Sequence, residues 1–168
     1  GKGQPASPDE GGSGEDEWVA DYLVTHDKPN HPILKGLPTQ WMHAQDELYG
    51  ALRGPAQNVE VLAHSYCRLT EANEPMMMIV SYGEGKTFHL PMGHYNDESE
   101  PYGASLQCVG FQTILARGTE FVATGKVTLG IPENFPTKKA ISYLPQDEVK
   151  WPDPTKKVSR RARRNGAS

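Results

Sequence analysis

The chain of 168 residues is long enough for one domain with a hydrophobic core, although 17 glycines, 14 prolines and a hydrophobic content of 36% predict much loop. Its net charge of −4 is uneven, because residues 138–168 hold nine Lys/Arg against three Asp/Glu, while residues 1–137 hold eight against eighteen. The two cysteines have no CxxC spacing, which argues against a disulfide scaffold and a CxxC zinc or redox site. Without an apolar run near the ~20 residues of a membrane span, or an apolar signal core, we expect a soluble mature chain, cytoplasmic or exported.

The chain begins with a predicted flexible lead, because residues 1–17 are rich in Gly, Pro, Ser and acids and offer almost nothing to bury. Residues 18–25 (WVADYLVT) predict a strand, which gives way to a polar loop. His26 and His31 flank this strand exit, and a second strand is predicted over residues 58–64.

A helix is predicted between these strands, over residues 39–54 (TQWMHAQDELYGALRG). Its apolar residues recur at roughly helical spacing, Thr39 is a suitable N-cap and Gly54 can end the helix. The opposite side of this helix would present one imidazole and two carboxylates together, from His43, Asp46 and Glu47.

A hairpin is predicted within residues 74–95 (EPMMMIVSYGEGKTFHLPMGHY). The apolar run 76–80 suits a strand buried on both faces and is too short for a globular helix. A Gly-Glu-Gly turn follows, and residues 86–90 then alternate apolar and polar side chains as a second strand does. This strand leads into Gly93 and His94, so His94 would stand at a strand end, where ligands bind in α/β sheets.

A second helix is predicted over residues 105–124, whose apolar stripe would pack on the sheet and whose C-terminal glycine is Gly125. Cys108 lies on the same side as Phe111, so a small buried residue is a better interpretation of it than a reactive thiol. Prolines recur beyond this helix and the chain ends in KKVSRRARRNGAS, which predicts an extended basic tail over residues 137–168.

Five segments of the chain resemble, in matching order, the ThuA-like (trehalose utilisation) family: HPILKGLP, WMHAQDELY, VEVLA, EPMMMIVSYGEGKTFHLPMGH and GFQTILARGTEFVATGKV. The resemblance covers about residues 22–136. It implies a role in sugar metabolism and an α/β fold, a three-layer flavodoxin-like sheet with flanking helices related to class I glutamine amidotransferases. Domains of that family normally begin with two or three βα units ahead of the HPI segment. We therefore expect residues 18–136 to form a partial ThuA-like domain that lacks its N-terminal units.

The first candidate site residues are His43, Asp46 and Glu47, as catalytic groups. Their i, i+3, i+4 spacing would place them on one helical face, suited to a metal or to acid–base work on a polyol, whereas a solvated polar face is the ordinary alternative. The DELY tetrad also matches a motif of the family. Tyr49 could donate a hydrogen bond to a sugar, although packing is an alternative role for it.

His94 is the other catalytic candidate. In the glutamine amidotransferase relatives, the strand after this hairpin ends with the histidine of the catalytic triad, and Gly93-His94 is similar in position. Gly93 and His31 complete the candidate substrate-binding set with Tyr49. His31 could equally cap a loop, because Pro32 holds it extended.

Two other functions find less support. Glutamine hydrolysis needs a thiol on a nucleophile elbow, and neither Cys67 nor Cys108 is bracketed by the small residues of such a turn. Nucleic-acid binding would rest on the basic tail, but no aromatic platform interleaves its charges and the rest of the chain is acidic. We therefore expect no nucleic-acid partner.

The sequence thus predicts a protein of carbohydrate metabolism that binds or transforms trehalose or a related sugar at strand ends, where His94, the 43–47 set and His31 would converge. The alternative is a non-catalytic carbohydrate-binding or protein-interaction module that uses the same polar groups. A perturbed, partly buried histidine beside a carboxylate would favour catalysis. Whether the chain is an enzyme, whether it uses a cofactor such as a divalent metal, and its oligomeric state stay open.

Overall fold

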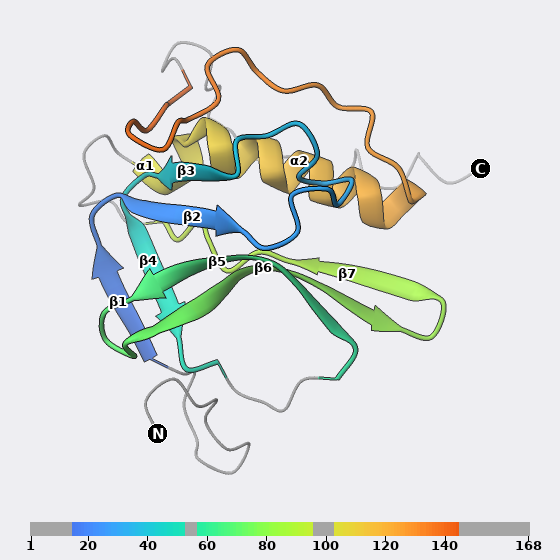
Figure 1. Cartoon of the computed structure of the whole chain (residues 1–168), viewed down its shortest axis with the longest axis horizontal. Coiled ribbons are helices and arrows are strands. Elements are labelled where there is room, and N and C mark those ends of the chain that lie inside the picture. The colour runs from blue at the N-terminus through green and yellow to red at the C-terminus, as the bar shows by residue number, and fades with distance from the viewer. Residues whose placement is uncertain (1–14, 53–56, 96–102, 145–168) are drawn as a thin grey trace, which may run out of the picture.

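The computed structural model describes residues 15–52, 57–95 and 103–144 of the chain. In this part a curled sheet of five strands carries most of the regular structure, and each neighbouring pair of strands is antiparallel (Figure 1). In sheet order it contains β3 (Gln40–His43), β2 (Tyr22–His26), β5 (Val59–Cys67), β6 (Ala72–Tyr82) and β7 (Gly85–His89). A separate two-stranded sheet pairs β1 (Glu15–Val19) with β4 (Asp46–Gly50).

The single strand predicted over residues 18–25 is divided between the two sheets. β1 ends at Val19 and β2 begins at Tyr22, with an exposed two-residue bend between them. The bend lets β1 pair with β4 while β2 pairs with β3 and β5. β1 also begins at Glu15, inside the predicted lead, and residues 1–14 of that lead lie outside the described residues.

The helix predicted over residues 39–54 is wrong, because this segment forms the two strands β3 and β4. Burial alternates along both strands with the period of two that a sheet imposes, and β3 is aligned with β2 from the pair Thr25 and Gln40 to the pair Tyr22 and His43. Pairing with neighbouring strands therefore outweighs the helical spacing of the apolar residues.

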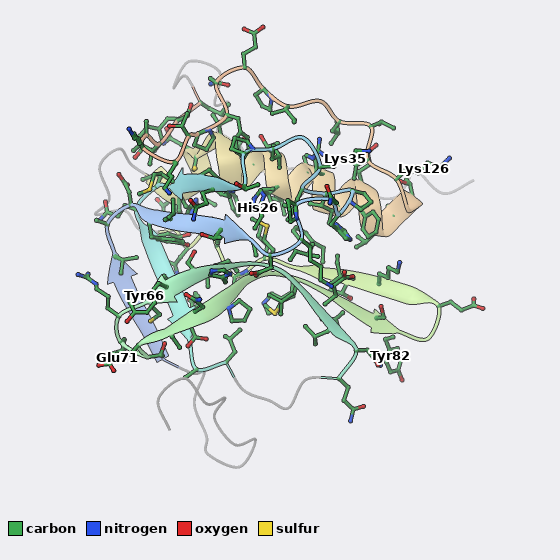
Figure 2. All side chains as sticks on the ribbon, in the orientation of Figure 1. His26, Lys35, Tyr66, Glu71, Tyr82 and Lys126 are labelled. Atoms are coloured by element: carbon green, nitrogen blue, oxygen red, sulfur yellow. The ribbon has the colours of Figure 1, made fainter. Side chains whose placement is uncertain are left out.

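The predicted hairpin and the predicted strand over residues 58–64 are confirmed, although β5 and β6 are longer than expected. Met76 and Met77 are fully buried and Ile79 is nearly so, as expected for a strand covered on both faces. Gly83 takes the left-handed φ of 56° that the turn requires. The tip of the hairpin projects from the body, and Tyr82 there is 90% exposed (Figures 1 and 2).

The predicted second helix is confirmed as α2 (Val109–Thr124), preceded by one turn, α1 (Ala104–Gln107). Cys108 separates the two helices with an extended backbone, and Gly125 ends α2 in the left-handed conformation of a C′ glycine. The helix lies close against the sheet, because a Cβ atom at Gly118 would meet the Phe88 ring at 2.1 Å.

The segment after α2 runs back along the helix and joins it to the N-terminal half of the chain (Figure 1). The buried guanidinium of Arg117 donates hydrogen bonds to four carbonyl oxygens from two separate segments. They belong to Pro32, Ile33, Lys35 and Leu129. Residues 137–144, the start of the predicted tail, form a bridge and hydrogen bonds with the α1–α2 region, and residues 145–168 lie outside the described residues.

The predicted mixed α/β class is confirmed. Within the described residues the sheet is antiparallel, so the three-layer flavodoxin-like arrangement is not observed there and stays a prediction. None of the helices in this part of the chain has the length and apolar character needed to cross a membrane.

Candidate functional site

Three polar side chains meet at the surface where β4 faces the segment that follows β7. Nδ1 of His94 lies 2.6 Å from Oε2 of Glu47. The Tyr49 hydroxyl donates to the same carboxylate oxygen at 2.6 Å and lies 3.3 Å from Nδ1 of His94. Glu47 and Tyr49 are two residues apart on one strand, so they point to the same side. The side chain of His94 is 43% exposed, so this Glu47–Tyr49–His94 cluster is open to solvent at its histidine.

Asp46 lies beneath the cluster and is fully buried. Its Oδ1 accepts hydrogen bonds from the backbone N–H of Glu47 at 2.8 Å and of His94 at 2.9 Å. Its Oδ2 accepts the backbone N–H of Gly93 at 2.7 Å and lies 2.7 Å from Nε2 of His43. An ionised carboxylate has about four lone-pair sites, and here four donors occupy them.

Gly93 is the residue that lets the chain bring two successive N–H groups to Asp46. Its φ is 90°, in the left-handed region that favours glycine, and a Cβ atom there would lie 2.4 Å from the Phe111 ring. A side chain at this position would therefore displace either the turn or the helix. The predicted role of Gly93 in substrate binding stays a prediction, whereas its role in the local backbone is explicit.

His43 is fully buried between Asp46 and Cys108. Burial alone would lower the pKa of His43, but interactions with the Asp46 carboxylate and the Cys108 thiol outweigh burial and raise it to about 9. At neutral pH this side chain is therefore an imidazolium that donates from Nε2 to Asp46. Nδ1 has no hydrogen bond of regular geometry, and the nearby thiol provides its polar surroundings.

Cys108 is buried, as predicted, but its contact with His43 was missed by the sequence interpretation. Burial raises the pKa of this thiol, but the interactions with His43 and with the backbone N–H groups of Phe111 and Ala44 lower it by more, so the net change is a decrease. The position of Cys108 at the start of α2 could have indicated this contact. The sequence does not show that position, because the apolar spacing continues through the break between α1 and α2.

His31 does not join the cluster. Its ring packs edge-on against Phe121 near the C-terminal end of α2, with 4.8 Å between ring centroids, and its Nδ1 accepts the backbone N–H of Ile33 at 3.3 Å. A cavity of about 260 Å³ lies between α2 and the segment after it, and none of the cluster residues lines it. Arg117 lines this cavity, and four of its N–H donors are bound to backbone carbonyls.

The described ranges contain no group of three or more His, Cys, Asp and Glu side chains arranged to hold a metal ion. The chemistry that the cluster itself offers is hydrogen bonding and proton exchange. An imidazole held at Nδ1 by a carboxylate is fixed in orientation. Carboxylate, phenol and imidazole groups are also common partners of hydroxyl groups.

Fold and site together define a mixed α/β protein with a polar cluster at the edge of its sheets. Residues 9–122 match the ThuA family, which is described as trehalose utilisation. Because this match covers more than half of the sequence, the chain belongs to the ThuA family. No curated protein matches the chain.

A solved structure resembles the chain as well. It is the crystal structure of a putative ThuA-like protein from Parabacteroides merdae, with a TM-score of 0.72 and 38% sequence identity. The alignment covers 80% of this chain but 49% of that one, so the present chain spans about half the length of this relative.

Proposed function

We propose that this chain binds a sugar derivative through the Glu47–Tyr49–His94 cluster, in a process related to trehalose utilisation. In this proposal His94 acts as a general acid or base towards a hydroxyl group of the sugar. The observation that carries the proposal is the 2.6 Å contact between His94 and Glu47, beside a solvent-exposed ring. A carboxylate-held histidine is the usual acid–base group of enzymes. Membership of the ThuA family supports a sugar as the ligand.

The role of each residue follows from its chemistry. Glu47 orients the imidazole and balances the charge of the imidazolium that forms when His94 takes up a proton. Tyr49 donates to Glu47 and thereby fixes the carboxylate oxygen that contacts His94. Asp46 and His43 are fully buried and hold no surface for a ligand, so their contribution is indirect.

A non-catalytic carbohydrate-binding module is the second candidate. The cluster lies at an open surface, and no residue of it lines the cavity beside α2, which is compatible with a shallow binding face. Glutamine hydrolysis has less support, because the Cys108 thiol is fully buried and its φ of −61° and ψ of 120° lack the strain of a nucleophile elbow. We also propose the three-layer flavodoxin-like arrangement that the family resemblance implies.

The test is a thermal-shift and calorimetric screen of trehalose, glucose and their oxidised derivatives against the wild-type chain, His94→Ala and Glu47→Gln. We expect binding that both substitutions weaken at least about tenfold, as for loss of a hydrogen bond to a charged group. His64→Ala is the matched control, because His64 pairs with Asp27 at 2.7 Å outside the cluster. Binding that His94→Ala and His64→Ala leave equally intact would contradict the site. Binding without turnover of any sugar in the screen would favour the module.

A further inference from the structure

Asp46 and Glu47 are consecutive residues of β4, yet both bind His94, one through its backbone and the other through its ring. Asp46 accepts the backbone N–H of His94 at 2.9 Å, whereas Glu47 contacts the imidazole Nδ1 at 2.6 Å. Successive side chains of a strand point to opposite sides, so Asp46 and Glu47 contact His94 from two directions. A histidine on a loop has many rotamers and backbone states, and two such contacts remove most of them.

We propose that the buried His43–Asp46 pair is a positioning device for His94, in which Asp46 holds the backbone of residues 93 and 94 and His43 holds Asp46. Neither residue touches a ligand. The proposal rests on the proposed function only for the chemical role of His94; the positioning itself is a property of the folded chain.

The first support is that Asp46 is fully buried and that four donors occupy its carboxylate. Its two oxygens accept N–H groups from the turn at Gly93 and from its own strand, with His43 as the fourth partner. An asparagine at position 46 would offer a single acceptor oxygen. Its amide nitrogen is a donor, so it could not accept a hydrogen bond from the N–H group that it faces. Asp46→Asn therefore changes little volume but must release at least one N–H of the turn.

The second support is that His43 is a fully buried partner of Asp46, at 2.7 Å from its carboxylate. Its ring is fully buried, and the titratable groups that face it are Asp46 from β4, Cys108 from the α1–α2 junction and Tyr22 from β2. Burying a carboxylate costs several kcal/mol unless it is paired. The His43 imidazolium offsets that cost.

The experiment follows amide hydrogen exchange and the ring resonances of His94 by NMR on the isotope-labelled chain, and it needs no ligand. In Asp46→Asn we expect the amide of Gly93 or that of His94 to exchange at least about tenfold faster, the factor for loss of one hydrogen bond to a charged group. The ring resonances of His94 at a fixed pH should also move towards those measured in Glu47→Gln, because a loosened turn lets the ring leave Glu47.

The matched control is Glu74→Gln. Glu74 is another buried carboxylate that accepts a backbone N–H, from Ala51 at 3.1 Å, at the other end of β4. A glutamine there keeps an acceptor oxygen for the Ala51 N–H, so Glu74→Gln should leave exchange at residues 93 and 94 and the ring resonances of His94 unchanged. A folded Asp46→Asn chain with wild-type exchange at residues 93 and 94 and wild-type ring resonances of His94 overturns the proposal.

The wild-type chain provides a second measurement in case Asp46→Asn does not fold. When the pH rises through the pKa of His43, the amide shifts of Gly93 and His94 should move with the same midpoint as the His43 ring, and that of Ala51 should not. The proposal is overturned if the amide shifts of Gly93 and His94 do not change as His43 titrates. Failure of the sugar screen would remove the proposed function but would leave both NMR results standing.

Discussion

A buried imidazolium such as His43 is stable only while its partners stay in place. Its pKa of about 9 lies above the value near 6.5 of an ordinary histidine, so the folded chain holds a proton that the unfolded chain releases above pH 6.5. The stabilisation from this proton is therefore complete below pH 6.5 and is lost as the pH rises through 9. The Asp46 carboxylate and the Cys108 thiol are its source.

We expect the free energy of unfolding, measured with urea, to fall by on the order of 2 to 3 kcal/mol as the pH is raised from 6.5 to beyond 9. His43→Gln should be less stable at pH 6.5 but should show a much flatter dependence, because its side chain does not titrate. The prediction fails if the wild-type and His43→Gln curves run parallel over this range.

The pKa of His26 is shifted in the opposite direction to that of His43. Burial lowers its pKa to about 4, with Asp27 acting in the other direction, and its Nε2 accepts the indole N–H of Trp41 at 3.0 Å. A protonated ring could not accept that hydrogen bond. Its contribution is therefore present above pH 6.5 and is lost as the pH falls through 4.

In urea titrations between pH 6.5 and 4.5 we expect wild-type chain to lose more stability than His26→Gln, since the variant has no ring to protonate. The comparison between the two chains removes the contribution of carboxylates, which titrate in both. An equal loss in both would show that His26 is not held neutral by the fold.

At the scale of elements, the segment 39–54 shows what the sequence could not reveal. The apolar residues Trp41 and Leu48 fit a helix as well as two strands, and the deciding burial of His43 and Asp46 is invisible until each has its partner. The hairpin and α2 were predictable because long apolar runs and a C′ glycine are local features. The sheet to which β1 and β4 belong depends on long-range pairing and was not predictable.

The close approach of α2 to the sheet yields a prediction about Gly118. Alanine is favoured over glycine inside a helix by about 1 kcal/mol, but its Cβ would meet the Phe88 ring at 2.1 Å. Overpacking of this kind costs about 1 to 3 kcal/mol, so we expect Gly118→Ala to lower the urea midpoint. Gly130→Ala is the control, because a Cβ atom there meets nothing within 4 Å. A Gly118→Ala chain as stable as Gly130→Ala would contradict the packing.

At the scale of the whole molecule, the site exists only because distant segments meet: β4, the turn after β7 and the start of α2. The residue types and the family motif made Asp46, Glu47, Tyr49 and His94 candidates from the sequence, and the fold places these four residues close together. Which of them is buried follows from the direction of each side chain along β4, and the separation of His31 follows from its place by α2. Neither is encoded in a local pattern.

That dependence on tertiary structure leads to a prediction of coupling. Glu47 and His94 are 47 positions apart in the chain and touch at 2.6 Å, so their substitutions should not be independent. In a double-mutant cycle on the free energy of unfolding, Glu47→Gln and His94→Ala should couple by about 0.5 kcal/mol or more, the range for residues in direct contact. Glu47→Gln with His64→Ala, which share no partner, should be additive within about 0.3 to 0.5 kcal/mol. Additivity in both cycles would mean that the contact contributes no measurable free energy in solution. A coupling confined to the first cycle would indicate that Glu47 orients His94 before any ligand binds. An acid–base group requires such an orientation.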